Sequence, residues 1–77
     1  MAFPEAIKMM RQKQFMSQET LAKELNVTTS TVHRWETGKN VPNLAARKRI
    51  KEFCESKGVT YEPIEQSWFE STKNNKK

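Results

Sequence analysis

Hydrophobic positions near the start of the chain recur at the spacing of a helix. In residues 3–14, Ile7 and Met10 lie three positions apart among polar neighbours, which predicts a short amphipathic helix. Phe15 and Met16 follow this helix. Because both side chains are large and apolar, we expect them to pack back on the core.

A second helix is predicted over residues 17–26. Ser17 is a good N-cap, because its hydroxyl can accept a hydrogen bond from a free amide of the first turn. Asn26 suits the left-handed backbone at a helix end. The apolar residues of this segment fall on one face, at Leu21, Ala22 and Leu25.

The next segment reads TTSTVHRWE and is rich in β-branched threonines, which favour strands. As a strand, however, Val32 and Trp35 would point to opposite faces. As a helix over residues 29–37, with Thr28 as N-cap and Gly38 as the left-handed end, the two share one side. The opposite arc is then polar and consists of Thr29, Ser30, His33 and Arg34.

A fourth helix is predicted over residues 43–56, capped by Asn43 and stopped by Gly58. Its inward positions are expected at Leu44, Ile50, Phe53 and Cys54.

Residues 59–70 leave two alternatives open. Pro63 can begin a short helix that places Ile64 and Trp68 one turn apart, or the segment lies extended. Trp68 and Phe69 either fold onto the core or form a partner or dimer surface.

The length of the chain limits the number of domains, and its charge indicates the kind of partner. Seventy-seven residues make one domain at most, predicted to span residues 1–58, with residues 71–77 as a disordered basic tail. The net charge of +5 favours an acidic partner such as nucleic acid. Residues 28–51 carry most of the excess, at Arg34, Lys39, Arg47, Lys48, Arg49 and Lys51 against Glu36 alone.

The composition argues against several other classes. The chain has no Asp, a single His and two glycines, so it offers no paired acids and no phosphate-binding glycine loop, and we expect no enzyme and no cofactor. His33 has no Cys or His partner at the sequence spacing that is typical of a metal site. Cys54 is the only cysteine, so no internal disulfide forms, and it is expected to be a buried apolar residue. No run is apolar enough for a membrane span and no secretory signal is visible, which predicts a cytoplasmic protein.

Two short helices joined by a tight turn, with a small residue at Ala22 where they cross, form the helix-turn-helix pattern. Residues 17–42 carry S-Q-E-x-L-A-x-x-L-N-V and then T-V-H-R-W-E-x-G-K. The chain thereby resembles the lambda-repressor-like (Cro-type, XRE) helix-turn-helix family over roughly residues 5–54. It departs from the family at Arg47, where many members have Leu, and after Gly58.

The resemblance implies a compact all-α domain of four to five helices, with the helix-turn-helix at about residues 17–37 and its third helix in the major groove of DNA. By position, it implies base reading by Thr29, Ser30 and Arg34, with His33 beside them. It implies contacts with the DNA backbone by Gln18, Lys39, Asn40 and Asn43, to which we add Thr28 and Thr31. It also implies a partly buried ion pair between Arg11 and Glu36, while Ala22, Val32 and Trp35 are structural.

The chemistry of these residues agrees with the resemblance. The planar guanidinium of Arg34 can pair with guanine O6 and N7, and the short side chains of Thr29 and Ser30 let the helix start approach base edges. Free amides at helix N-termini bind phosphate. The position of Thr31 stays open between a phosphate contact and inward packing.

Some of these residues also have other possible roles. The hydroxyl cluster of residues 28–31 could be phosphorylated, and Trp35 could stack on a base, although capping and core packing explain them. The group Lys48, Arg49 and Lys51 is either a solvated helix face or a contact with the DNA backbone.

The leading hypothesis is sequence-specific binding of double-stranded DNA by a small transcriptional regulator of bacterial or phage type, such as a repressor, associated with the nucleoid in the cytoplasm. One domain of this size covers little DNA, so we expect a homodimer on a two-fold symmetric site. The alternative is an antitoxin or adaptor whose acidic and aromatic segment, residues 59–70, binds a protein partner.

Overall fold

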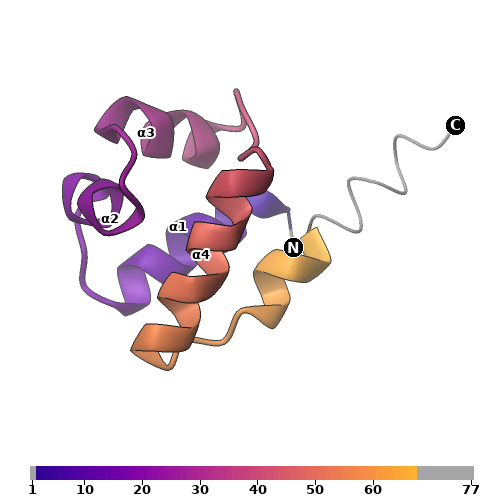
Figure 1. Cartoon of the computed structure of the whole chain (residues 1–77). Helices are drawn as coiled ribbons and strands as arrows, with labels where there is room; N and C mark the ends of the chain where they lie inside the picture. Colours follow the sequence, from indigo (N-terminus) through magenta and orange to yellow (C-terminus); the bar gives the residue numbers. More distant parts are fainter. Residues whose placement is uncertain (1, 68–77) are drawn as a thin grey trace, which may run out of the picture.

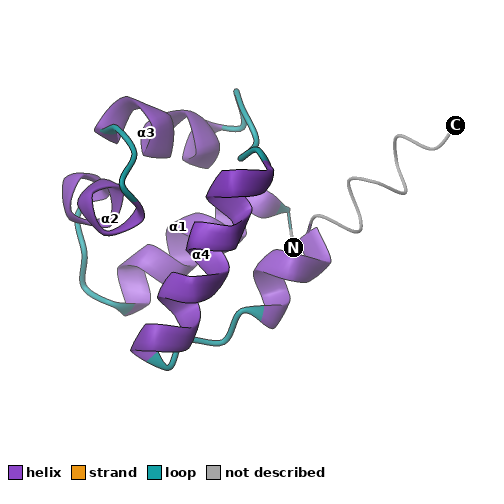
Figure 2. Cartoon of the chain, in the orientation of Figure 1, coloured by secondary structure: helices purple, strands orange, loops and turns teal. Residues whose placement is uncertain are grey.

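The computed structural model describes residues 2–67, and all regular structure in them is helical (Figures 1 and 2). The predicted all-α fold class is therefore confirmed. Four labelled helices follow one another as α1 (Phe3–Lys13), α2 (Gln18–Leu25), α3 (Thr29–Thr37) and α4 (Leu44–Lys57). A further helical segment covers residues 62–67.

Short polar side chains begin three of the helices, and left-handed residues end them, because these residues satisfy the amides and carbonyls that a helix end leaves free. The side-chain oxygens that accept a first-turn amide are those of Ser17 (from Thr20), Thr28 (from Thr31) and Asn43 (from Ala46), at 3.1, 3.1 and 2.9 Å. The residues with positive φ that end α2, α3 and α4 are Asn26, Gly38 and Gly58. All six capping predictions are confirmed.

The core lies where α3 packs on α1 and α2, and where α2 packs on α4 (Figure 1). An aromatic contact joins α1 to α3, because the rings of Phe3 and Trp35 meet edge to face with centroids 6.3 Å apart. The core consists of Phe3, Ala6, Ile7, Met10, Leu21, Ala22, Leu25, Val32, Trp35, Ala46, Ile50, Phe53, Cys54 and Ile64.

Two residues expected in the core lie outside it. Phe15 is 97% exposed, whereas its neighbour Met16 packs against the core as predicted. Phe15 follows the end of α1 and takes a left-handed backbone with φ of 58°, so the chain reverses there and only Met16 returns to the interior. Leu44 is 80% exposed because it is the first residue of α4, where the helical rotation places it well away from the inner face that contains Ile50 and Phe53.

The segment after Gly58 returns to the body of the protein. Of its two alternatives, the structure has the helix, which covers residues 62–67 and buries Ile64 and Ser67 to 1% exposure each. The hydroxyl of Ser67 donates to the carbonyl of Ile64 at 2.6 Å, which satisfies this buried polar group. The predictions for Trp68, Phe69 and the tail of residues 71–77 concern residues outside the described part of the chain.

Cys54 is buried in the core, as predicted, and its thiol lies 3.4 Å from the sulfur of Met10. Burial, together with the nearby charge of Glu55, raises the pKa of this thiol to about 11. The group therefore stays a protonated, weakly reactive thiol near neutral pH. Within residues 2–67, no helix combines the length and hydrophobicity that crossing a membrane requires.

Candidate nucleic-acid interface

The polar arc of α3 forms one exposed surface. Its four residues and Gln18, from the start of α2, line a single shallow hollow. We call this surface the reading face, and it consists of Thr29, Ser30, His33 and Arg34. All four side chains are exposed, so the predicted base-reading residues lie together and face solvent.

The opposite side of α3 is buried. Val32 is fully buried and Trp35 is 2% exposed, which confirms the predicted core role of Trp35. Because both side chains are buried where α3 packs on α1 and α2, the axis of α3 has one orientation relative to these two helices. The reading face is thus displayed by a rigid support.

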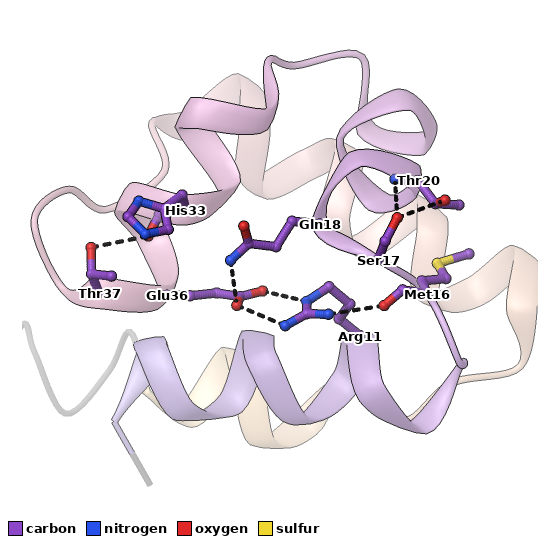
Figure 3. A network of polar contacts seen from close by, with 8 residues as sticks. All are labelled: Arg11, Met16, Ser17, Gln18, Thr20, His33, Glu36 and Thr37. Carbon is purple, nitrogen blue, oxygen red and sulfur yellow. Dashed lines mark hydrogen bonds and ion pairs between the residues drawn. The ribbon is translucent and has the colours of Figure 1, made fainter.

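An ion pair between α1 and α3 lies beside the reading face (Figure 3). The Nε and Nη2 atoms of Arg11 donate to the two carboxylate oxygens of Glu36 at 2.7 and 3.0 Å. The remaining terminal nitrogen of Arg11 donates to the carbonyl of Met16 at 2.9 Å. Only 3% of the Glu36 side chain and 14% of the Arg11 side chain are exposed, so the structure contains the partly buried pair that the resemblance implies.

The electrostatics of this pair favour its charged form. The hydrogen bond with Glu36 raises the pKa of Arg11, and the attraction of the two charges adds to this, while burial opposes it. A bidentate contact between a guanidinium and a carboxylate is among the strongest side-chain hydrogen bonds. The pair therefore holds α1 against α3 in one register.

Gln18 joins this network in a way that the sequence did not indicate. Its side-chain nitrogen donates to Glu36 at 3.0 Å, across 18 residues of sequence (Figure 3). The same carboxylate therefore binds Arg11 from α1 and Gln18 from α2. As a result, the first residue of α2 is fixed relative to the reading face, whose hollow it also lines.

A second hollow lies between the end of α3 and the start of α4. Its lining includes four residues predicted to contact the DNA backbone, namely Thr31, Lys39, Asn40 and Asn43. The connection is well ordered by its own hydrogen bonds, because the amides of Lys39 and Asn40 both donate to the carbonyl of Arg34, at 2.9 and 3.4 Å. We call this region the loop hollow.

The structure adds Arg49 to the loop hollow. Its guanidinium donates to the carbonyl of Asn26 at 3.4 Å, which ties α4 to the turn between α2 and α3. The sequence left Arg49 open together with Lys48 and Lys51, and only Arg49 lines this hollow. Helical spacing from Ala46 could have singled it out, since Arg49 lies one turn beyond that residue.

Thr31 is half-buried at the edge of the loop hollow. Its hydroxyl lies 2.8 Å from that of Thr28, and its amide donates to the same Thr28 oxygen. The open question about Thr31 thus has an intermediate answer, because its hydroxyl completes the cap of α3 rather than entering the core. Among residues 2–67, no three side chains of metal-ligating type lie close enough together to hold an ion.

A comparison with the sequence profiles of known families shows to which protein family this chain belongs. The sequence profile of the helix-turn-helix family matches residues 7–49, more than half of the chain. The chain belongs to the helix-turn-helix family. The match covers most of α1, both helices of the motif and the first part of α4, in agreement with the XRE-type resemblance seen in the sequence.

One curated helix-turn-helix protein is similar over most of this domain. The chain is 36% identical over 53 residues to the HTH-type transcriptional activator BcrR of Enterococcus faecalis. The aligned part covers 69% of this chain and 26% of that protein, so the chain spans about a quarter of its relative's length. No solved structure matches the chain significantly.

Proposed function

We propose that this helix-turn-helix domain binds double-stranded DNA in a sequence-specific manner and serves a regulator of transcription. The observation that carries the proposal is the reading face. It is a set of exposed polar side chains at the capped start of α3, on a helix whose other side is locked into the core. A helix of this kind fits the major groove, where base edges differ in donors and acceptors.

Arg34 carries most of the proposed base discrimination. Its exposed guanidinium can donate two parallel hydrogen bonds to guanine O6 and N7, a contact worth about 1–3 kcal/mol against a wrong base. Thr29 and Ser30 lie in the first turn of α3, and their short side chains let the helix start approach base edges closely. His33 lies one turn beyond Thr29 and Ser30 on the same face, so its ring also reaches the groove.

Contacts with phosphate come from both sides of the reading face. On one side the side chain of Gln18 is positioned by its hydrogen bond to Glu36, and its second amide hydrogen can donate to a phosphate of the DNA. On the other side are the capping threonines and the loop hollow, with Thr28, Thr31, Lys39, Asn40 and Asn43. We add Arg49 to this set because it lines the same hollow. These contacts give affinity that falls with salt, because each neutralised phosphate releases counterions.

The related protein supports a role in transcription, since an HTH-type transcriptional activator is 36% identical to this chain over 53 residues. The proposed role in transcription can be either activation or repression. A single domain contacts too few base pairs for tight specific binding, so we further propose that two copies bind a two-fold symmetric site with half-sites about one helical turn apart.

The test is selection of binding sites from a pool of random duplexes, carried out with the 77-residue chain, with Arg34→Ala and with Lys57→Ala. Lys57 lies in the last turn of α4 and outside both hollows, so its variant loses the same charge without a proposed base contact. The wild type and Lys57→Ala should select one motif, whereas Arg34→Ala should bind weakly with little preference. An Arg34→Ala variant that selects the same motif with equal preference would refute the assignment of the reading face.

A further inference from the structure

A hollow between α1 and the chain that follows α4 has no part in the proposed DNA interface. It is lined by residues of α1 and by residues between 58 and 64 (Figure 1). It shares no lining residue with the hollow of the reading face or with the loop hollow. We call it the α1 hollow, and its apolar lining consists of Ala6, Met9, Met10, Val59, Pro63 and Ile64.

The α1 hollow has the size and the walls of a site for a small apolar molecule. Its volume is about 400 Å³, and ligand pockets in proteins span about 300–1,000 Å³. Ala6, Met10 and Ile64 are each no more than 4% exposed, so the floor of the hollow is the core itself. Water on such a floor finds few hydrogen-bond partners, and an apolar group that displaces it gains free energy.

The walls of the α1 hollow are held in place by contacts within the chain. The amide of Val59 donates to the carbonyl of Cys54 at 2.8 Å, and the amide of Ile64 donates to the carbonyl of Tyr61 at 3.0 Å. On the α1 side, the sulfur of Met10 lies 3.4 Å from the thiol of Cys54. Because the walls are already ordered, a ligand binds without the entropic cost of ordering them.

The polar part of the lining supplies hydrogen-bond donors and one positive charge. It consists of Lys13, Gln14 and Thr60. Within residues 2–67, Lys13 forms no ion pair, and no acidic side chain from this part of the chain lines the hollow. A carboxylate complements such a set, because its two oxygens only accept hydrogen bonds and its single negative charge matches the single ammonium group.

We propose that the α1 hollow binds a small amphipathic acid, with the alkyl chain against the core and the carboxylate at Lys13. The ligand class is therefore a monocarboxylic acid with a medium-length aliphatic chain. This inference goes beyond the proposed function and does not depend on it, because the hollow and the DNA interface are separate surfaces.

The experiment titrates the ¹⁵N-labelled 77-residue chain with sodium octanoate, sodium butyrate and octylammonium chloride, and follows the backbone amides by nuclear magnetic resonance. Octanoate and octylammonium share an alkyl chain and differ in the sign of their charge, whereas butyrate keeps the carboxylate on a shorter chain. The variant Lys13→Glu reverses the charge at the hollow. Lys8→Glu is the matched control, because it makes the same change at an exposed position of α1 outside the lining.

Octanoate should bind the wild type with a dissociation constant of about 0.1–1 mM, the range for a preformed site and a ligand of about ten non-hydrogen atoms. The largest shifts should fall in residues 9–14 and 58–64. Butyrate should bind at least about 10-fold more weakly, because it buries fewer methylene groups.

The charge of the ligand should matter as well. Octylammonium should bind the wild type about 3- to 10-fold more weakly than octanoate, since Lys13 attracts one headgroup and repels the other at a partly exposed site. Lys13→Glu should bind octylammonium more tightly than octanoate. Lys8→Glu should keep the preference of the wild type.

Several outcomes would overturn the inference. Absence of saturable octanoate binding in the millimolar range would mean that water or another part of the chain occupies the hollow. Saturable shifts confined to other surfaces would place the ligand elsewhere. Equal affinities for octanoate and octylammonium, or an unchanged preference in Lys13→Glu, would remove the acid from the proposal. None of these results bears on the selection of DNA sites, so the inference and the proposed function fail separately.

Discussion

The two faces of α3, a helix of nine residues, differ in burial and in proposed role. Val32 and Trp35 on the inner face are almost completely buried, while every residue of the reading face is exposed. Core residues cannot change without loss of packing, whereas exposed polar residues change with little effect on stability. If the reading face contacts bases as proposed, its residues can change the DNA preference of the protein without disturbing the core.

Glu36 is the link between the two faces. Its carboxylate is buried at the end of the inner face, yet it holds Gln18, which lines the same hollow as the reading face. A substitution of Glu36 should therefore affect both stability and DNA binding. A substitution on one face alone should mainly affect one of the two.

Trp35→Ala should have the largest effect. Removal of a buried aromatic side chain costs about 3–5 kcal/mol, and a small domain has little more than that to lose. The variant should be largely unfolded at room temperature by far-ultraviolet circular dichroism. His33→Ala, on the opposite face, should stay within about 0.5 kcal/mol of the wild type, and an equal loss in both variants would erase the contrast between the faces.

Glu36→Gln should come next. It leaves the guanidinium of Arg11 without its carboxylate, and breaking a buried pair in this way costs about 3 kcal/mol, with partial exposure of Arg11 reducing the loss. Denaturant unfolding of Glu36→Gln, Arg11→Met and the double variant measures the coupling. Simple addition of the two single losses would show that the pair contributes nothing as a unit.

Arg34→Ala should leave the unfolding free energy within about 0.5 kcal/mol of the wild type while discrimination between the selected duplex and a scrambled one falls by about 1–3 kcal/mol. The unfolding free energy and the affinities for the two duplexes should be measured on the same protein sample. A stability loss larger than the loss of discrimination would mean that Arg34 belongs functionally to the inner face.

Thr28→Ala should have the smallest effect, about 1 kcal/mol of stability, because the amide of Thr31 loses its capping oxygen. Thr28→Ser keeps that oxygen and should behave like the wild type. If both variants lose equal stability in thermal unfolding, the methyl group of Thr28 matters and the cap does not.

Local signals in the sequence were enough to predict where the helices begin and end. The residues Ser17, Thr28 and Asn43 cap their helices, and Asn26 and Gly38 end them, because these positions depend on bonds within three or four residues. The Arg11–Glu36 pair was found only through the family resemblance, since 25 residues separate the two.

The errors arose where hydrophobic character and position disagree. Phe15 and Leu44 are apolar enough for the core, yet one follows a helix end in a left-handed turn and the other opens a helix on its outer side. The bond between Gln18 and Glu36 was missed because it depends on how α2 and α3 cross. Such contacts follow from tertiary packing and leave no periodic signal in the sequence.

The central claim is that the outer face of α3 and the following loop meet the DNA. Nuclear magnetic resonance spectra of the ¹⁵N-labelled chain, recorded while a selected duplex is added, test it residue by residue. The backbone amides of residues 29–34, 38–41 and 43 should shift most, while those of residues 52–57 at the far end of α4 should remain nearly unchanged. Shifts concentrated in residues 52–67, with α3 undisturbed, would contradict the account.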